Sequence, residues 1–363
     1  MAKKNIQDTD SLEVRTLKGT IASLKKKMRG LETNESLIVE AVMEAYEDGL
    51  PKLTLPKKPA KSRKVSEEVA VLHLADLHFG KITDTYDSSI AESRLQQLVE
   101  KVRNITNIRR NGAKIDEIRV YLGGDMIEGE QIFAHQAHLI DQSLFEQAVK
   151  TAPAALSRAI LALMEEFPKV VVRTCPGNHG RNGPKKTSSH PKTNWDNVCY
   201  EITKLMLMGP DGDRAGMADR LDFDISETFY FVDHVWNWGN LCIHGDQIRG
   251  HSGLPWLGVQ KKTFGWIDTI PEVFDNLYFG HFHTYASAVI NHRTFYANGT
   301  LESDNEFAQE LLASGGYPCQ RLQFFNEEHG CISDNQVFIS DEYSQRLPVG
   351  VQELKKYKNI GKS

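Results

Sequence analysis

Five short motifs rich in aspartate, asparagine and histidine lie in the middle of this chain. They are Asp76-x-His78, Gly124-Asp125, Gly177-Asn178-His179, His244-Gly245-Asp246 and Gly280-His281-Phe282-His283. Each follows an apolar stretch that predicts a β-strand. The carboxyl ends of strands are where ligands bind in open α/β sheets. We therefore expect these side chains, far apart in the sequence, to meet at one place.

The donors in these motifs are carboxylate and amide oxygens and imidazole nitrogens, and none of them is a thiolate. This set favours Mn²⁺, Fe²⁺ or Zn²⁺ in mixed nitrogen and oxygen coordination. The residues themselves therefore predict a metal site with mixed oxygen and nitrogen ligands.

The elements that must position the first three motifs alternate between strand and helix. β-branched apolar stretches predict strands, and helical periodicity predicts the helices between them. Strands are expected at 69–75, 118–122 and 170–174, and helices at 90–105 and at 147–167 in spite of Pro153. This order is typical of a sheet that is at least partly parallel.

The pattern changes to successive strands from Phe223 onward. Strands are expected at 229–232, 241–244, 277–279 and 288–290, and a hairpin at 320–325 and 336–340. Two of these strands end directly before the fourth and fifth motifs. The whole body is therefore predicted to be an α/β fold.

The motifs D-x-H, G-D, G-N-H, H and G-H-x-H, in this order, resemble those of the calcineurin-like metallophosphoesterases. The resemblance covers Val69 to about Gly299 and extends to the hairpin ending at Ser340. It implies a four-layer α/β/β/α sandwich with two facing mixed sheets, here with an N-terminal helical extension. The expected boundaries are 1–50 for this extension, 51–65 for a basic proline-rich linker, 66–341 for the metallophosphoesterase domain and 342–363 for a C-terminal tail.

The resemblance also implies a role for each motif residue. Asp76, His78 and His283 would bind one metal ion, Asn178, His244 and His281 would bind a second, and Asp125 would bridge the two. His179 would face the scissile phosphate without binding metal, and Glu128 would orient its imidazole. A carboxylate beside a histidine keeps the imidazole protonated to higher pH, which suits a general acid. Of the two divalent ions, Mn²⁺ is expected, with Fe²⁺ or Zn²⁺ as alternatives.

The function implied is hydrolysis of phosphodiester bonds in DNA by attack of a metal-bridging hydroxide. The H-G-D motif looks more like the Mre11/SbcD-like exonuclease branch, although that branch often has histidine at the position of Glu128. The alternative is a phosphomonoesterase or a small-molecule (cyclic nucleotide) phosphodiesterase. Protein phosphatases carry arginine where this chain has Gly129, which lowers the expectation of a phosphoprotein substrate. A catalytically inactive binding scaffold is a minor alternative, because scaffolds typically have broken ligand sets.

A glycine-rich basic loop, G-R-N-G-P-K-K, begins at Gly180, directly after the third motif. It can grip phosphates of a longer substrate, or it can be an ordinary solvated loop. The candidate substrate contacts are Arg181, Lys185, Lys186, His135 and Arg249. The family often has an acid where this chain has Gly180, so the support of the Asn178–His179 loop is open.

Charge is distributed unevenly along the 363 residues. The net charge of −5 excludes a protein that coats nucleic acid by charge alone. Residues 1–64, however, carry a net charge of +5, and the remainder carries −10. Apolar residues at 3-4 spacing from Val14 to Leu31 predict a helix, which can form a hairpin with a second helix at 37–46, form a homodimer or dock on its own body. DNA and a second copy of the chain are therefore the expected partners.

The five cysteines form no C-x-x-C pair, which excludes a zinc finger and a disulfide framework. Cys175 and Cys242 lie in strands that lead to the motifs, and neither has a base partner recognisable in the sequence, so a cysteine nucleophile is not expected. No apolar run approaches 18 residues. A cytoplasmic protein with no membrane partner is expected.

Overall fold

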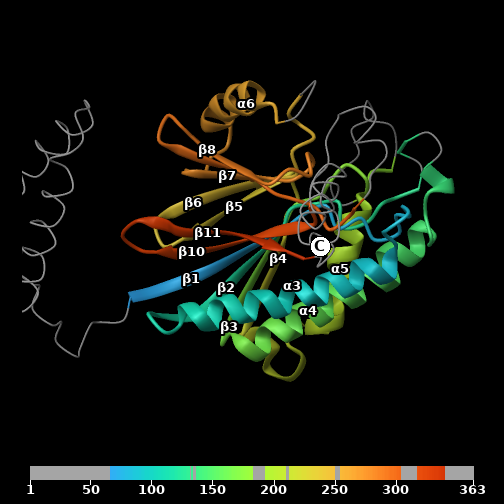
Figure 1. Ribbon diagram of the computed structural model, residues 1–363, viewed down its shortest axis with the longest axis horizontal. Coiled ribbons are helices and arrows are strands. Elements are labelled where there is room, and N and C mark those ends of the chain that lie inside the picture. The colour runs from blue at the N-terminus through green and yellow to red at the C-terminus, as the bar shows by residue number, and fades with distance from the viewer. Residues whose placement is uncertain are drawn as a thin grey trace, which may run out of the picture. The chain divides into compact units, whose positions relative to one another are not determined.

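The computed structural model describes residues 66–130, 132–133, 136–182, 193–209, 212–249, 254–303 and 317–339 (Figure 1). The chain divides into two compact units, Met1–Arg63 and Lys64–Ser363. All described residues belong to the second unit. The helical extension, the linker and the C-terminal tail expected from the sequence lie outside the described residues.

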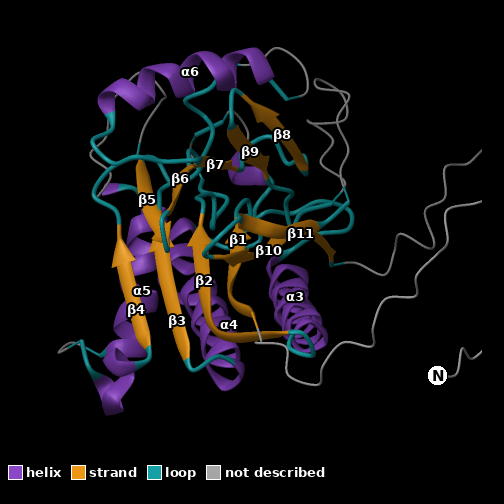
Figure 2. Cartoon of the chain, turned by 90° about the vertical axis from the view of Figure 1, so that its left-hand side faces the viewer, coloured by secondary structure: helices purple, strands orange, loops and turns teal. Residues whose placement is uncertain are grey.

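Six strands form the first sheet, in the order β11-β10-β1-β2-β3-β4. The parallel strands are β1 (Ser66–Leu74), β2 (Ala113–Leu122), β3 (Lys169–Thr174) and β4 (Leu221–Ile225). The antiparallel strands are β10 (Cys319–Asn326) and β11 (Gly330–Phe338). The parallel direction of β2, β3 and β4 is visible in Figure 2. Leu74 pairs with Leu122 and Leu122 with Thr174, so β1, β2 and β3 end side by side, directly before the first three motifs.

Five strands form the second sheet, in the order β5-β6-β7-β9-β8. They are β5 (Tyr230–Val235), β6 (Trp238–Ile243), β7 (Asn276–Phe279), β8 (Ala286–Ile290) and β9 (Arg293–Ala297). β6, β7 and β9 run parallel, and the edge strands β5 and β8 are antiparallel to their neighbours. β6 and β7 end directly before His244 and Gly280. The α/β class and the two mixed sheets predicted from the sequence are therefore confirmed.

Three apolar clusters hold these elements together. The helices α3 (Ser88–Arg109), α4 (Ala152–Glu166) and α5 (Trp195–Met208) pack on the first sheet through one cluster. A second cluster, which includes Val71, Tyr121 and Tyr278, joins the two sheets. A third packs α6 (Trp256–Thr269) on the second sheet. Figure 1 shows this order, from α6 through the two sheets to α3 and α4. No described helix is both long and apolar enough to cross a membrane.

The helix expected at 147–167 is interrupted at its start. A π-helical segment covers Glu146–Thr151, and α4 begins at Ala152 with Pro153 in its first turn. Proline lacks an N–H and its ring clashes with the carbonyl four residues back. The helical turn before Pro153 is therefore wider than an α-helical turn, and the Ala152 N–H donates to Gln147 O, five residues back. Pro153 thus starts the α-helix rather than lying inside it.

Among the described α-helices and β-strands, four were not expected from the sequence: α5, α6, β4 and β9. The strand β11 also begins at Gly330, six residues before the expected Gln336. The polar run Ser333–Gln336 interrupts the strand, and its residues are exposed or only partly buried, so the apolar pattern marks only its end. Pairing with β10, rather than local composition, extends this strand.

Candidate metal centre

The five motifs lie together at the carboxyl ends of their strands, and backbone hydrogen bonds connect them. The Asp76 N–H donates to Gly124 O (3.1 Å), and the His78 N–H donates to Asp125 O (3.0 Å). The His179 N–H donates to Asp125 Oδ1 (2.8 Å). The Gly280 N–H donates to His244 O (2.8 Å). The loops therefore form one connected scaffold.

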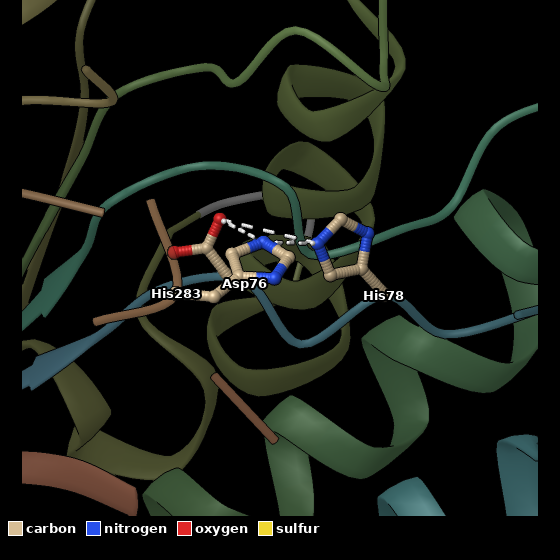
Figure 3. Close-up of side chains that lie close together, drawn as sticks. All are labelled: Asp76, His78 and His283. Atoms are coloured by element: carbon tan, nitrogen blue, oxygen red, sulfur yellow. Dashed lines mark hydrogen bonds and ion pairs between the residues drawn. The ribbon is translucent and has the colours of Figure 1, made fainter. Parts of the chain in front are cut away.

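The first cluster of donors is Asp76, His78 and His283, called here the first subsite (Figure 3). His283 Nε2 lies 3.3 Å and His78 Nε2 3.9 Å from Asp76 Oδ1, and the two Nε2 atoms are 3.2 Å apart. Buried carboxylates contact the opposite nitrogens. Glu128 Oε2 lies 2.9 Å from His78 Nδ1, and Glu302 Oε1 lies 2.6 Å from His283 Nδ1. Both Nε2 atoms therefore face one point beside Asp76.

The second subsite is Asn178, His244 and His281, and the carboxylate of Asp125 lies beside it. His244 Nε2 lies 2.9 Å from Asp125 Oδ2 and 3.1 Å from Asn178 Oδ1. Its Nδ1 donates to Gly123 O at 2.9 Å. His281 groups with Asp125 and His244, and its ring centroid lies 5.1 Å from that of His244. The structure thus brings together all seven residues named as ligands from the sequence.

The backbone of the site is strained. Five of the seven candidate ligands have φ in the left-handed region: Asp76 (56°), His78 (49°), Asp125 (54°), His281 (66°) and His283 (50°). Among the other described non-glycine residues, only Trp236, Asn291 and His292 share it, and they lie in the turns joining β5 to β6 and β8 to β9. Such a conformation costs about 1–3 kcal/mol per residue and is typical of functional sites.

Close approach of the loops requires glycine at Gly280. A Cβ there would lie 2.2 Å from Asp76 Oδ2. The next N–H, that of His281, donates to both carboxylate oxygens of Asp76 (3.1 and 3.0 Å). The motif that supplies His281 and His283 is therefore fixed directly to the carboxylate of the first motif.

The histidines of the two subsites differ in their protonation state when no metal is bound. Burial disfavours the charged form of His283, but the surrounding carboxylates raise its pKa to about 10. The same opposition raises the pKa of His244 to about 10. Burial and the neighbouring charged His244 lower the pKa of His281 to about 3. Burial and His179 also lower the pKa of His78. In the metal-free protein near neutral pH, each subsite thus has one charged and one neutral histidine. The carboxylates beside the charged histidines stabilise this positive charge.

His179 lies beside both subsites. Its Nδ1 lies 2.8 Å from the Glu128 carbonyl oxygen and 3.2 Å from Glu128 Oε2, and its Nε2 lies 3.9 Å from Asp125 Oδ2. Burial alone would lower the pKa of His179, but Glu128 and Asp125 raise it to about 9. Glu128 in turn contacts two histidines, because Oε2 also meets His78 Nδ1. The sequence suggested only its contact with His179.

The N-terminus of α5 supports the Asn178–His179 loop, which the sequence left open. The Asp196 carboxylate accepts from the N–H groups of Asp125 (2.9 Å) and Gly177 (2.8 Å). Asn194 Nδ2 donates to Gly177 O (2.8 Å). A Cβ on Gly180 would lie 2.2 Å from Asn194 Oδ1, so only glycine fits. Sequence reasoning missed Asn194 and Asp196 because α5 was not expected.

The candidate substrate contacts divide into described and undescribed residues. Arg181 places its guanidinium on Asp246 Oδ2, which ties the third motif to the fourth. Arg249 is exposed. His135, Lys185 and Lys186 lie outside the described residues. Phe133 was not singled out from the sequence; its ring centroid lies 4.9 Å from that of His179 and half of its surface is exposed.

Cys242 has a neighbour that the sequence did not indicate. Its Sγ lies 3.8 Å from His73 Nε2. Burial, which raises the pKa of Cys242, is outweighed by Cys175 and His73, so the pKa falls to about 6. All five cysteines are free, and Cys175, Cys242 and His73 are fully buried in the core beneath the site. A substrate cannot reach this thiol without opening the core.

No family model and no curated protein matches this chain. Among solved structures, a hypothetical protein from Pyrococcus horikoshii OT3 is 12% identical, with a TM-score of 0.38 over 79% of this chain and 94% of that one. Zinc-bound Vps29 from Entamoeba histolytica is 11% identical, with a TM-score of 0.31 over 75% and 99% of the two chains. An archaeal phosphodiesterase is 8% identical, with a TM-score of 0.33 over 74% and 99%. Similarities this distant leave the geometry of the site as the basis for a function.

Proposed function

We propose that this protein is a two-metal phosphoesterase of the calcineurin-like type that hydrolyses phosphodiester bonds, with DNA as its substrate. The observation that carries the proposal is the arrangement of the donors. Asp76 and Asp125 each lie among two histidines with which they could hold a metal ion. His179 lies 3.9 Å from the carboxylate of Asp125 and also groups with His78 of the first subsite. We also propose the four-layer sandwich of this family for the domain, in line with the three apolar clusters.

The donor set fits two divalent cations. Three histidines have Nδ1 beside an oxygen, so each directs Nε2 into the site. The first subsite would hold one ion, the second subsite the other, and Asp125 would contact both. When bound, such ions lower the pKa of water and neutralise phosphoryl charge. Mn²⁺ is our first choice, with Fe²⁺ or Zn²⁺ as alternatives, because the donors include no sulfur.

His179 supplies the proton in this proposal. The Glu128 carbonyl oxygen can only accept, so His179 Nδ1 carries a hydrogen. In the metal-free protein its pKa of about 9 keeps the imidazole protonated at Nε2 as well near neutral pH. Nε2 can then donate to the oxygen of the leaving alcohol, while Glu128 stabilises the charged ring. Asp125, Glu128 and the backbone thus hold the acid in place before substrate arrives.

Two features support a nucleic-acid substrate. Residues 1–64 carry a net charge of +5, which suits phosphate backbone contacts. The half-exposed ring of Phe133 beside His179 offers a surface on which a base can stack. A phosphomonoesterase or cyclic-nucleotide phosphodiesterase is the second candidate, favoured by Glu128, an acid that recurs in phosphatase branches. The complete ligand set weighs against an inactive scaffold.

The proposal is tested first with a small diester. Purified protein with Mn²⁺ is expected to hydrolyse bis-(p-nitrophenyl) phosphate. No turnover with any of Mn²⁺, Fe²⁺, Co²⁺ or Zn²⁺ would contradict an enzyme of this class. Labelled single- and double-stranded DNA then separates the candidates by product length. Activity on p-nitrophenyl phosphate or cyclic nucleotides without DNA cleavage would favour the second candidate.

Deletion of residues 1–64, called here the leader, tests their contribution to DNA binding. Because these residues carry the net positive charge, the shortened protein is expected to bind DNA more weakly and with a shallower salt dependence. Turnover of bis-(p-nitrophenyl) phosphate should persist, since all the candidate ligands lie beyond residue 64. If DNA binding is unchanged, the leader serves another role such as the expected homodimer, which sedimentation of both proteins would reveal.

A further inference from the structure

We propose that Glu302, paired with Lys81, orients His283 as an Nε2 ligand and thereby sets the metal affinity of the first subsite. This inference rests on the proposed function, because it assumes that the first subsite binds metal. It assigns a positioning role to a residue outside all five motifs, which follows β9 at the sheet edge where the motifs meet.

The contacts of Glu302 define the orientation of His283. The residue is 2% exposed. Oε1 lies 2.6 Å from His283 Nδ1, and Oε2 lies 2.5 Å from Lys81 Nζ. A buried carboxylate is stable only when it is paired and hydrogen-bonded, and Lys81 supplies that pair. An ionised carboxylate can only accept hydrogen bonds. His283 must therefore keep its hydrogen at Nδ1 when a metal displaces the proton at Nε2, so that Nε2 offers its lone pair to the metal.

The segment around Glu302 is fixed to the first motif. Thr300 Oγ1 donates to Asp76 O at 2.8 Å, and the Leu301 N–H donates to the same oxygen at 3.2 Å. From α3, Arg94 donates to Leu301 O (2.6 Å) and to Ser303 Oγ (3.0 Å). The carboxylate that holds His283 is thus anchored beside Asp76, its neighbour in the first subsite. Such anchoring keeps both ligands in register.

A purely structural ion pair is the competing explanation, and the chain offers a matched control for it. Glu68 is 5% exposed, and its carboxylate binds Arg109 Nε (2.5 Å) and Nη2 (3.2 Å). It lies near the start of β1, whereas Asp76 follows the end of that strand. Glu68→Gln therefore removes a buried carboxylate from an ion pair at the opposite end of β1 from the metal centre.

Glu302→Gln is expected to act on metal binding in addition to stability. The neutral amide no longer increases the basicity of His283. If its NH₂ group turns toward Nδ1, the ring hydrogen must move to Nε2 and block coordination. Loss of such a partner typically costs 10–100-fold in metal affinity. The Mn²⁺ dissociation constant of one site should therefore rise by about 10–100-fold, while that of the other stays unchanged.

The experiment titrates metal-free full-length protein with Mn²⁺ by calorimetry and records melting temperatures in parallel. The wild type, Glu302→Gln, Glu302→Asp and Glu68→Gln are compared. We expect weakened binding at one site in Glu302→Gln, partial recovery in Glu302→Asp, and unchanged binding in Glu68→Gln. Unchanged affinities in Glu302→Gln, with only a lower melting temperature, would overturn the inference. Equal weakening of both sites would overturn its assignment to the first subsite.

A second measurement uses the wild type, so it does not depend on a variant that folds. In Zn²⁺-loaded protein, long-range ¹H–¹⁵N spectra report which ring nitrogen of His283 carries hydrogen. We expect hydrogen at Nδ1, and hydrogen at Nε2 would overturn the inference. Failure of the wild type to bind either Mn²⁺ or Zn²⁺ is a different result, because it would overturn the proposed metal centre itself.

Discussion

The two subsites hold their histidines by different means. In the first subsite, ionised carboxylates lie behind both rings: Glu128 behind His78 and Glu302 behind His283. In the second subsite, a backbone carbonyl, Gly123 O, accepts from His244, and the oxygen donor Asn178 is a neutral amide. Carboxylate partners increase the basicity of a histidine ligand. If both subsites hold metal as proposed, this difference predicts tighter binding at the first subsite and faster exchange at the second.

Asp125 contacts residues of both subsites, so its loss should have the largest effect. Its carboxylate contacts His244 and His179, and its carbonyl accepts from His78. Asp125→Asn is expected to reduce diester turnover to background and to weaken both metal sites. Metal content by atomic emission, with turnover measured in parallel, checks this. One fully retained metal ion would show that Asp125 serves only one subsite.

His179 belongs to neither subsite, so its removal should separate chemistry from metal binding. His179→Ala is expected to lower diester turnover by about 10²–10⁴-fold, the usual contribution of a general acid. Both metal ions should remain, as metal analysis of the variant can verify. Loss of a metal ion would instead make His179 a ligand, and the assignment of roles around Asp125 would have to change.

A pair of alanine variants compares the subsites directly. His283→Ala removes a ligand that is held by a carboxylate, and His281→Ala removes one from the second subsite. A Mn²⁺ titration of the wild type should resolve a tighter and a weaker step. His283→Ala is expected to lose the tighter step and His281→Ala the weaker one. The reverse pattern would refute the proposed order of affinities.

Metal binding to both subsites should depend on pH. His244 and His283, with pKa values of about 10, are charged in the metal-free protein at neutral pH, whereas His281, at about 3, is neutral. A metal must displace one proton from each subsite, so binding should release about two protons and affinity should rise with pH. Each released proton corresponds to about a tenfold gain per pH unit.

Calorimetry of Mn²⁺ binding in buffers of different ionisation enthalpy counts the released protons, and repeating it at pH 7 and pH 8 gives the slope. Injection of Mn²⁺ into the same buffers without protein controls for heats of dilution and buffer effects. A pH-independent affinity would mean that His244 and His283 are already neutral when the ions arrive. The carboxylates around these two histidines would then not keep their imidazoles protonated.

Much of the candidate site could be predicted from the sequence because its signals are local. A strand that ends in Asp76-x-His78 or Gly280-His281-Phe282-His283 places donor types at a sheet edge, and the topology of the sheets then decides that they meet. The helix at 90–105 and the strands β1, β2 and β3 were predicted for the same reason, since their apolar periodicity is strong.

The residues that sequence reasoning missed act across long separations. Glu302 contacts His283 from the segment that follows β9, and Asp196 contacts Asp125 from α5. Neither β9 nor α5 was predicted from the sequence. A single glutamate or aspartate outside a motif looks like any solvated carboxylate. Only burial, which makes an unpaired charge costly, reveals that these two must have partners.

The sequence by itself determined the donor types, their order and the strand ends that carry them. Only the tertiary structure decided which ring nitrogen each histidine turns into the site, which histidines are charged, and which carboxylates stand behind them. The physical reason is that donor chemistry belongs to a single residue, whereas tautomer and pKa depend on charges and hydrogen bonds that packing brings within about 3–4 Å. The asymmetry between the two subsites is therefore a property of the fold.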